Sequence, residues 1–372
     1  MPSYRRLFLF LAAVCLPACW PAYAAAADFS VCTFSAAADC LRSFTPAGAA
    51  GALHYYASLD PDAPAATAAT ATAAGPTKAL IAMHGHSRDA NKTFEATLRT
   101  VRNAGTLGDT LVIAPLFQVP ADKAAAGRCN TPGLPAPQSG DLLWTCGSWL
   151  EGGRSASGSR IGSFAVMDAL VAELVQRWPG LRTITIAGFS AGGQFVQRYA
   201  AFAQIGGTAG TLGKVAVRYV VADPSTWLYF DPVRPQFATD GTSVAGFAVP
   251  DATACPEMNR WKYGTDDLPA HLGRSAEQAR RQYAEADISY LEGALDSNDA
   301  KGTAYRVLDR SCAALAQGSF RLQRGLAYAQ YDRAVLAPGK QRQVVVVPGC
   351  AHDVACVFPS EAARAALIGP SR

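Results

Sequence analysis

The sequence predicts an α/β protein in which a mostly parallel central sheet is flanked by helices. Short apolar runs of strand length alternate along the chain with segments whose apolar residues recur at helical spacing. Strands that alternate with helices pair in parallel, because each crossover helix carries the chain back over one face of the sheet. Of the 372 residues, 50% are hydrophobic and 17% are charged, so the chain can bury a large core. We find no linker or internal repeat and expect a single domain over residues 28–372.

The elements follow from the local patterns. The predicted strands cover residues 51–59, 78–83, 110–117, 183–186, 215–222, 288–291 and 343–347. The predicted helices cover residues 90–104, 163–178, 192–203, 312–334 and 360–368. Residues 60–77 consist mainly of alanine, threonine and proline, and we interpret them as a flexible surface connection.

After the strand at 215–222 the alternation stops until about residue 286. This segment is rich in proline and in the aromatic residues Trp227, Tyr229, Phe230, Phe237, Phe247, Trp261 and Tyr263. We expect residues 226–286 to form a lid or cap-like insertion after the sixth strand, over the carboxyl edge of the sheet. Its aromatic side chains either line a groove for an acyl or polymer substrate or pack the lid itself.

Residues 1–27 have the three parts of a secretory signal peptide. Arg5 and Arg6 form a basic start, residues 7–19 are apolar, and small residues surround Tyr23. The apolar part is shorter than the roughly 20 residues that a membrane-spanning helix needs. We therefore expect cleavage of the signal and export to the periplasm or the cell exterior. Anchoring as a lipoprotein through Cys19 is the alternative, although Pro17 fits that pattern poorly.

Removal of the signal takes Cys15 and Cys19 with it. The remaining cysteines are Cys32, Cys40, Cys129, Cys146, Cys255, Cys312, Cys350 and Cys356. Their number is even and an exported protein meets an oxidising compartment, so we expect disulfides. We hypothesise sequential pairing: 32 with 40, 129 with 146, 255 with 312, and 350 with 356. No cysteine or histidine spacing is typical of zinc sites, so we expect no structural metal.

The motif that dominates the chain is Gly188-Phe189-Ser190-Ala191-Gly192, which follows one predicted strand and opens the next predicted helix. This is a G-x-S-x-G pattern, in which glycines allow close backbone approach on both sides of an exposed serine. The surrounding strand and helix are the context in which such a serine acts as a nucleophile.

Three weaker motifs accompany it in a specific order. Met83-His84-Gly85-His86 follows an earlier strand, Gly293-Ala294-Leu295-Asp296 follows a later one, and His352 comes just after the last strand. With these features, residues 78–368 resemble the α/β-hydrolase superfamily, and in particular its serine esterases. The resemblance implies a catalytic serine, acid and histidine in that order along the chain.

A serine hydroxyl is a poor nucleophile at neutral pH and needs a neighbouring base, usually a histidine oriented by a carboxylate. Only His271 and His352 lie beyond Ser190 in the sequence. His352 follows a buried strand at the sheet edge where Ser190 emerges, whereas His271 belongs to the irregular insertion. We therefore predict His352 as the general base and interpret His271 as a solvated loop residue.

Two strand ends offer an acid. Asp296, in the G-x-x-D turn, matches the usual position in the superfamily and is our first choice. Asp223, in an Asp-Pro turn, is the second choice, with capping of local backbone amides as its structural interpretation. Asp299 is a third candidate, and Asp353 lies too near His352 in sequence to orient its ring easily.

Attack on an acyl carbon creates an oxyanion that needs preorganised hydrogen-bond donors. The backbone N–H of Ala191, at the start of the helix, is one expected donor. The resemblance implies that the N–H of His86 is the other. We expect the imidazole of His84 to order its loop.

These expectations describe an exported serine hydrolase that cleaves carboxylic esters, small or polymeric, without cofactor or metal. A peptidase, an amidase or an acyltransferase would use the same residues, and a noncatalytic secreted binding protein with this fold is the alternative from another class. The net charge of +4 and the absence of basic runs in the body of the chain disfavour nucleic acid as a partner. The sequence leaves the oligomeric state open.

Overall fold

The computed structural model describes residues 31–60, 75–205, 212–251 and 253–369. The predicted signal at 1–27, the alternative anchor Cys19 and most of the 60–77 connection lie outside the described residues. Within the described part of the chain, no helix has the length and apolarity needed to cross a membrane.

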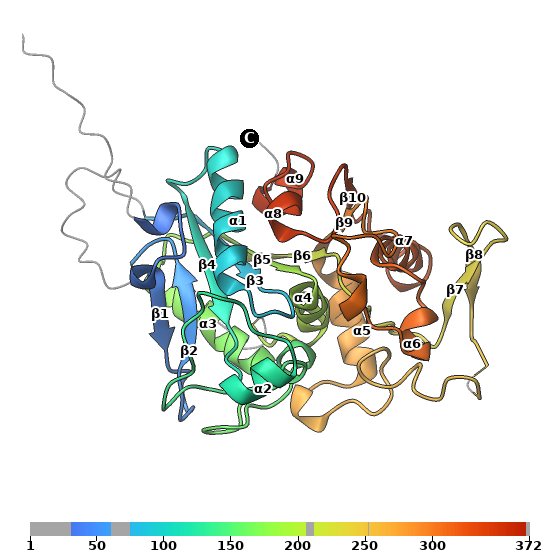
Figure 1. The fold of residues 1–372 in the computed structure, drawn as a ribbon, viewed down its shortest axis with the longest axis horizontal. Coiled ribbons are helices and arrows are strands. Elements are labelled where there is room, and N and C mark those ends of the chain that lie inside the picture. Colours follow the sequence, from blue (N-terminus) through green and yellow to red (C-terminus); the bar gives the residue numbers. More distant parts are fainter. Residues whose placement is uncertain (1–30, 61–74, 206–211, 252, 370–372) are drawn as a thin grey trace, which may run out of the picture.

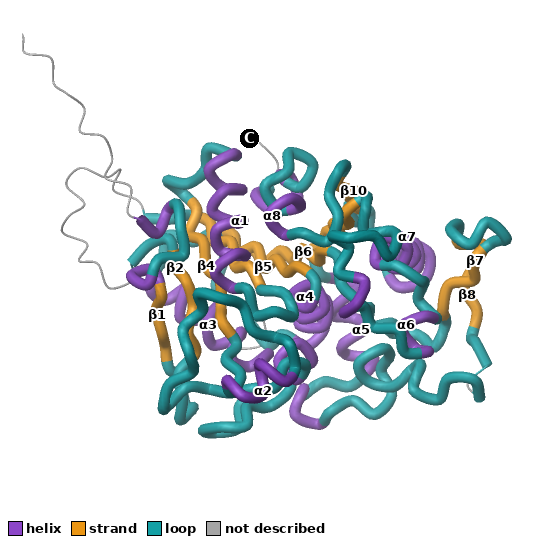
Figure 2. The backbone as a smooth tube through the Cα atoms, in the orientation of Figure 1, coloured by secondary structure: helices purple, strands orange, loops and turns teal. Residues whose placement is uncertain are grey.

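An eight-stranded sheet runs through the centre of the molecule in the order β1-β2-β4-β3-β5-β6-β9-β10 (Figures 1 and 2). Its strands are β1 (Leu41–Phe44), β2 (Leu53–Ala57), β3 (Lys78–Met83), β4 (Thr110–Leu116), β5 (Thr183–Phe189), β6 (Ala216–Ala222), β9 (Asp287–Gly293) and β10 (Val344–Val347). The pairs β1 with β2 and β2 with β4 are antiparallel, and the other pairs are parallel. The mostly parallel sheet is therefore confirmed.

Helices cover both faces of the sheet. They are α1 (Ala90–Asn103), α2 (Ala121–Ala126), α3 (Ser163–Arg177), α4 (Ala191–Phe202), α5 (Ala276–Glu285), α6 (Cys312–Leu315), α7 (Arg321–Tyr331), α8 (Val354–Val357) and α9 (Arg364–Ile368). The core on one face includes residues of α3, α4, α5 and α7, and the core on the other includes residues of α1, α8 and α9. In β3, Ala79, Ile81 and Met83 join the first core, whereas Leu80 and Ala82 join the second. An apolar run without alternation thus indicates a strand buried on both faces.

The four hypothesised disulfides are all present. They join Cys32 to Cys40, Cys129 to Cys146, Cys255 to Cys312 and Cys350 to Cys356. The last one closes the short loop that carries His352. Four disulfides are typical of proteins from an oxidising compartment.

The predicted helix at 312–334 is wrong as a single element. It is divided into α6, α7 and a π-helical turn at Asp332–Leu336. Gly318 has a φ of +136°, which a continuing helix does not allow, and the break follows from it. Because of the break, Arg321 stands at the start of α7, a position that matters for the site described below.

Four further differences concern short elements. β1 and α8 were not predicted, and the last helix is shorter than expected, because residues 360–363 form turns rather than helix. The early strand at 51–59 is also shorter, at Leu53–Ala57. Short elements give little periodicity, which explains these boundary errors.

The segment after β6 is more regular than its sequence suggested. It contains the hairpin of β7 (Arg234–Phe237) and β8 (Val244–Ala248), which projects at the right of Figure 1, and it ends in α5. Trp227, Tyr229 and Phe230 are buried at its start, and Trp227 stacks on Tyr328 of α7 with a ring separation of 4.3 Å. These aromatic residues pack the core and do not line a groove. The lid function of residues 226–286 stays a prediction.

Candidate active site

Ser190 stands at the turn between β5 and α4, with a φ of 59° and a ψ of −118°. A Cβ on Gly188 would lie 2.1 Å from the carbonyl oxygen of Gly192, and a Cβ on Gly192 would lie 2.3 Å from that of Met83. Only glycine fits at these two positions, which gives the G-x-S-x-G pattern its physical reason. The serine is held in a strained turn and its side chain is partly exposed.

His352 lies between Ser190 and Asp296. Its Nε2 is 2.8 Å from the Oγ of Ser190, and its Nδ1 is 2.7 Å from the Oδ2 of Asp296. The imidazole packs on the ring of Phe189, with 4.7 Å between ring centroids, and its backbone N–H donates to the oxygen of Gly302. The orientation of the imidazole is therefore fixed by contacts to both ring nitrogens, by packing on Phe189 and by the backbone hydrogen bond of His352.

The protonation of His352 suits a base. Burial lowers the pKa of His352, and the positive charge of Arg321 lowers it further, while the hydrogen bond and charge of Asp296 act in the opposite direction. A lowered pKa keeps the imidazole neutral at neutral pH, so that Nε2 can accept a proton from the serine hydroxyl when Nδ1 donates to Asp296.

Asp296 is buried and has a second partner. Arg321 donates from Nη1 to its Oδ1 over 3.2 Å, while the same nitrogen donates to the oxygen of Thr303 over 2.7 Å. The turn that carries Asp296 is bonded to the histidine loop, because the N–H of Leu295 donates to the oxygen of Cys350. Asp296 and His352 are thus positioned by the same pair of loops.

The alternative acids have other partners. Asp223 is fully buried and accepts a hydrogen bond at Oδ1 from the N–H of Gly293 over 2.8 Å. It therefore binds an amide of the neighbouring strand β9 rather than the local amides that we expected from its Asp-Pro turn. Asp299 is exposed, and Asp353 accepts from the N–H of Ala355 at the start of α8. Of the four candidates, only Asp296 hydrogen-bonds to the imidazole of His352 in the described part of the chain.

The loop after β3 passes beside the serine. A Cβ on Gly85 would lie 3.7 Å from the Cβ of Ser190, and the N–H of Gly85 donates to Oδ1 of Asp89 over 2.8 Å. The next N–H along this loop belongs to His86, whose ring points to the oxygen of Gly127 at 3.3 Å. The loop therefore brings the His86 backbone near Ser190 while its imidazole lies against another segment.

His84, two residues before His86, has backbone groups as the partners of its ring nitrogens. It is fully buried, and its Nδ1 lies 2.8 Å from the oxygen of Gly85 while its Nε2 accepts from the N–H of Phe117 over 3.3 Å. Burial lowers its pKa to about 3, so the ring stays neutral with the proton on Nδ1. His271 contacts the oxygen of Gly152 through Nε2 at 2.9 Å; it is half-buried in a short 3₁₀ helix, Ala270–Leu272, and is not the solvated loop residue that we expected.

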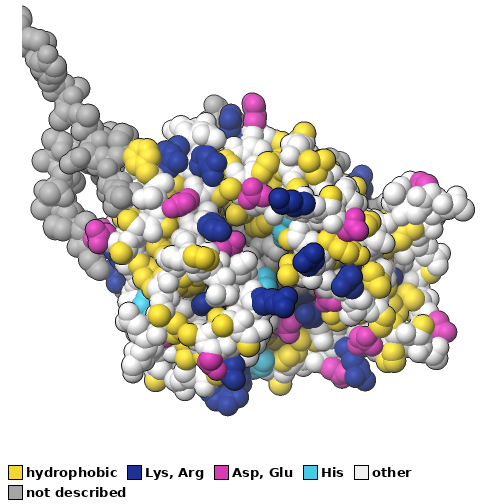
Figure 3. Space-filling model, in the orientation of Figure 1, with side chains coloured by type: hydrophobic (Ala, Val, Ile, Leu, Met, Phe, Trp, Pro, Cys, Tyr) yellow, Lys and Arg dark blue, Asp and Glu magenta, His cyan; other side chains and the backbone are white. Residues whose placement is uncertain are grey.

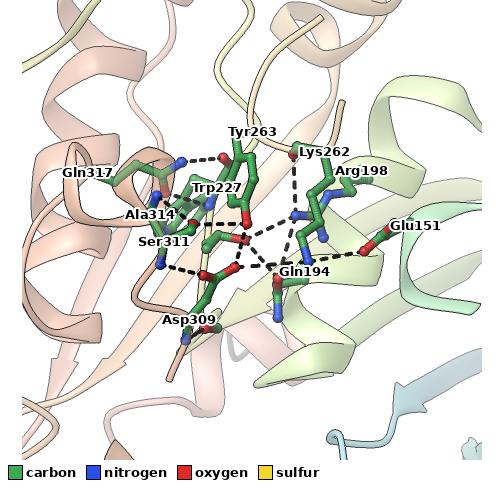
Figure 4. A network of polar contacts seen from close by, with 12 residues as sticks. Glu151, Gln194, Arg198, Trp227, Lys262, Tyr263, Asp309, Ser311, Ala314 and Gln317 are labelled. Atoms are coloured by element: carbon green, nitrogen blue, oxygen red, sulfur yellow. Dashed lines mark hydrogen bonds and ion pairs between the residues drawn. The ribbon is translucent and has the colours of Figure 1, made fainter. Parts of the chain in front are cut away.

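A polar network lies beside α4, the helix that starts at the serine (Figure 4). Arg198 donates to the hydroxyl of Thr226 over 3.2 Å, and Lys262 pairs with Glu151 over 3.1 Å. The hydroxyl of Tyr263 donates to Asp309 over 2.7 Å. These contacts tie the segment after β6 to α4, to the 3₁₀ helix at Ser148–Glu151 and to the loop before α6. The Cys255–Cys312 disulfide joins the same segment to the first residue of α6.

Figure 3 shows the side chains on one face of the molecule, in the orientation of Figure 1. The view is hollowed near its centre, where histidine side chains are visible and lysine and arginine side chains stand around the hollow. A partly exposed Ser190 agrees with access for a substrate from solvent.

Two groups of side chains in the described part of the chain have the spacing of metal ligands. One consists of Asp223, Asp296 and His352, with ligand-type atoms within 4.8 Å of one another. These side chains already bind Gly293, Arg321 and Ser190, and the guanidinium of Arg321 supplies the cation next to Asp296. The other group contains Cys255 and Cys312, which form a disulfide. Neither donor set fits a metal ion.

Sequence reasoning missed two residues of this site, Arg321 and Glu292. Glu292 is fully buried on β9, directly before the G-x-x-D turn. A glutamate that interrupts an apolar strand next to a functional turn is a signal that the sequence offered. Arg321 gave no such signal, because its position depends on the break in the helix.

Comparisons with known proteins agree on the fold. No protein-family model and no curated protein matches the sequence. The structure is similar to poly(aspartic acid) hydrolase-1 from Sphingomonas sp. KT-1, with a TM-score of 0.54 and 20% identity over 88% of this chain and 98% of that chain. It is also similar to a poly(3-hydroxybutyrate) depolymerase from Bordetella parapertussis, with a TM-score of 0.54 and 15% identity over 87% of each chain. With the strand order described above, these similarities show that the chain has the α/β-hydrolase fold.

Proposed function

We propose that this protein is an exported serine hydrolase that cleaves carboxylic esters through an acyl-enzyme on Ser190. The observation that carries the proposal is the continuous hydrogen-bonded chain from the Oγ of Ser190 through His352 to Asp296, at 2.8 and 2.7 Å. Nucleophile, base and orienting acid are the three groups that acyl transfer to a serine requires.

In the proposed reaction, Nε2 of His352 takes the hydroxyl proton as the Oγ of Ser190 attacks the carbonyl carbon of the ester. Asp296 keeps the proton on Nδ1 and stabilises the imidazolium that forms. The carbonyl oxygen becomes an oxyanion, for which the N–H groups of Ala191 and His86 are the proposed donors. The imidazolium then protonates the alcohol that leaves, and a water molecule, deprotonated by His352, hydrolyses the acyl-enzyme to acid and free serine.

Export is part of the proposal. The signal-like residues 1–27 and the four disulfides support it, because disulfides persist in oxidising compartments. The substrate class extends to polymers, since both similar structures are named as polymer hydrolases, one of poly(aspartic acid) and one of poly(3-hydroxybutyrate).

The test is hydrolysis by the purified mature protein of p-nitrophenyl esters of increasing acyl length, with a polyester, poly(aspartic acid) and a peptide as parallel substrates. We expect turnover of at least one ester and its loss in Ser190→Ala. Turnover of the peptide or the amide polymer without any ester would assign the site to amide hydrolysis. No turnover of any of these substrates would contradict the proposal and favour a binding protein with this fold.

A further inference from the structure

A buried pair of acidic residues lies behind the proposed triad acid. Asp223, at the end of β6, and Glu292, near the end of β9, are both fully buried. Their side chains lie within hydrogen-bonding reach of each other. Two buried carboxylates in contact repel each other and cannot both be ionised without a large cost.

The oxygen atoms of this pair lack donors. Asp223 receives the N–H of Gly293 at Oδ1, but its Oδ2 and both Oε atoms of Glu292 have no hydrogen-bond donor in the described part of the chain. A proton shared between Glu292 and Asp223 would satisfy Oδ2 and remove one of the two charges. Buried polar groups are almost always satisfied in this way or by another partner.

The charges around the pair do not replace that proton. The groups that face Glu292 are Asp223, Asp296 and Arg321. Arg321 is the cation among them, and it donates hydrogen bonds to Asp296 and to the carbonyl oxygens of Thr303 and Ala304. Three acidic groups thus share one cation, which donates to Asp296 but makes no hydrogen bond to Asp223 or Glu292 among the described residues.

Helix α7 packs closely against the Glu292 side chain. A Cβ on Gly325 would lie 1.9 Å from Oε1 of Glu292, so the helix has a glycine where the carboxyl group packs against it. Glycine in a helix interior costs about 1 kcal/mol relative to alanine. The fold accommodates the buried carboxyl group at the expense of helix stability.

We propose that Glu292 holds a proton at neutral pH and donates it from its carboxyl O–H to Oδ2 of Asp223, as a positioning residue for the triad acid. Asp223 in turn accepts from the N–H of Gly293, and the oxygen of Gly293 accepts from the N–H of Asp296 over 3.0 Å. This path fixes both ends of the G-x-x-D turn. Burial, followed by the charges of Asp223 and Asp296, raises the pKa of Glu292 well above its ordinary value, which agrees with the geometry.

The protonation of Glu292 and Asp223 also determines how much negative charge lies near His352, the proposed base. Burial and the charge of Asp296 raise the pKa of Asp223 to about 7, and the hydrogen bond from a protonated Glu292 favours its ionised form. The Asp223 carboxylate lies within 4.8 Å of the ligand-type atoms of Asp296 and His352. A negative charge at that distance favours the protonated form of an imidazole by about 1 pKa unit or more. The inference that this charge affects catalysis rests on the proposed function. The inference that Glu292 is protonated does not.

Infrared difference spectroscopy tests the proton directly. We expect the wild-type protein at neutral pH to show the carbonyl stretch of a protonated carboxylic acid, and Glu292→Gln to lack that band. The exposed Glu285 on α5 provides the matched control, since Glu285→Gln should leave the band unchanged. An identical band in wild type and Glu292→Gln, or no such band in wild type, would overturn the proposal. This readout is independent of any enzymatic activity.

The positioning role is tested by the titration of His352, followed by NMR. In Glu292→Leu, Asp223 loses its donor and becomes protonated, so we expect the pKa of His352 to fall by about 1 unit. Glu292→Gln keeps a neutral donor and should restore the wild-type titration. Equal titrations in all three proteins, or a shift in Glu292→Gln as large as in Glu292→Leu, would refute the role. A protein that shows these shifts but hydrolyses no ester would disprove the proposed function and leave this inference standing.

Discussion

The loop after β3 and the loop after β10 both place a histidine at the same edge of the sheet, but the two histidines have opposite environments. Both nitrogens of His84 face backbone groups, those of Gly85 and Phe117. Both nitrogens of His352 face side chains that can exchange or hold a proton, those of Ser190 and Asp296. The ring of His84 therefore has no group with which to exchange a proton.

Burial lowers the pKa of both histidines, so the shift alone does not separate them. For His84 backbone hydrogen bonds oppose burial without a neighbouring carboxylate among the causes, and the pKa falls to about 3. For His352 the carboxylate of Asp296 opposes the shift. The partners of the ring nitrogens, more than the depth of burial, distinguish His84 from His352, the proposed base.

The largest loss of activity is expected when His352 is replaced. Replacement by glutamine removes the base, and kcat should fall by on the order of 10⁶-fold, while the melting temperature changes little. Steady-state kinetics on the best ester substrate and a thermal melt measure both quantities. Residual activity within tenfold of wild type would mean that His352 is not the base.

The next largest loss of activity is expected when Asp296, the proposed acid, is replaced. Asp296→Asn should lower kcat by about 10⁴-fold, because the imidazole loses the carboxylate that fixes its tautomer. Asp223→Asn changes a group that acts through the turn and should cost about tenfold, equivalent to one hydrogen bond. The ranking of the two acids is wrong if Asp223→Asn is the more damaging change in the same assay.

Replacement of His84 should lower stability more than activity, which is the opposite of the result expected for His352. His84→Phe keeps the volume of the ring but leaves the N–H of Phe117 without its acceptor, so the free energy of unfolding should fall by about 2 kcal/mol. The value of kcat/KM should change by less than about tenfold. Chemical denaturation and kinetics on the same sample separate the two effects, and a large loss of kcat at unchanged stability would contradict a structural role.

The pKa of His84 also predicts a pH dependence of stability. Its pKa is lowered from 6.5 in the unfolded chain to about 3 in the folded one, so the unfolded chain binds the extra proton first. Stability from this group is complete above pH 6.5 and is lost as the pH falls toward 3. The decrease in unfolding free energy between these pH values should be smaller in His84→Phe than in wild type, and equal slopes would refute the assignment.

The smallest effect is the position of the acid limb of kcat/KM. The pKa of His352 lies below its ordinary value of 6.5, so the neutral base persists and activity should decline only below that pH. A pH–rate profile with the best ester substrate measures this, and an acid limb centred above pH 6.5 would contradict the environment described for His352.

The order of the motifs made much of the site predictable. The glycines around Ser190, the G-x-x-D turn and the histidine after the last strand are local patterns, and parallel strands bring their carboxyl ends to one edge of the sheet. The acid could be ranked because Asp296 lies in a turn of the expected type. Its distance from His352 could not be read from the sequence.

The rest depended on tertiary contacts or on local signals that were overlooked. Ser275 and Gln278 form a capping box at the start of α5, a readable signal within a segment predicted to be irregular. Arg321 reaches Asp296 only because the chain breaks near Gly318, which a periodicity search does not detect. The contact between Glu292 and Asp223 joins residues far apart in sequence, and no local pattern specifies it.

Covalent labelling of Ser190 tests the central claim most directly. The wild-type protein is treated with a fluorophosphonate probe, and the modified peptide is identified by mass spectrometry. We predict a single adduct on Ser190, none in Ser190→Ala, and much slower labelling in His352→Gln, because the hydroxyl then lacks its base. Wild-type protein that is folded but does not react, or that reacts at another residue, would contradict the account.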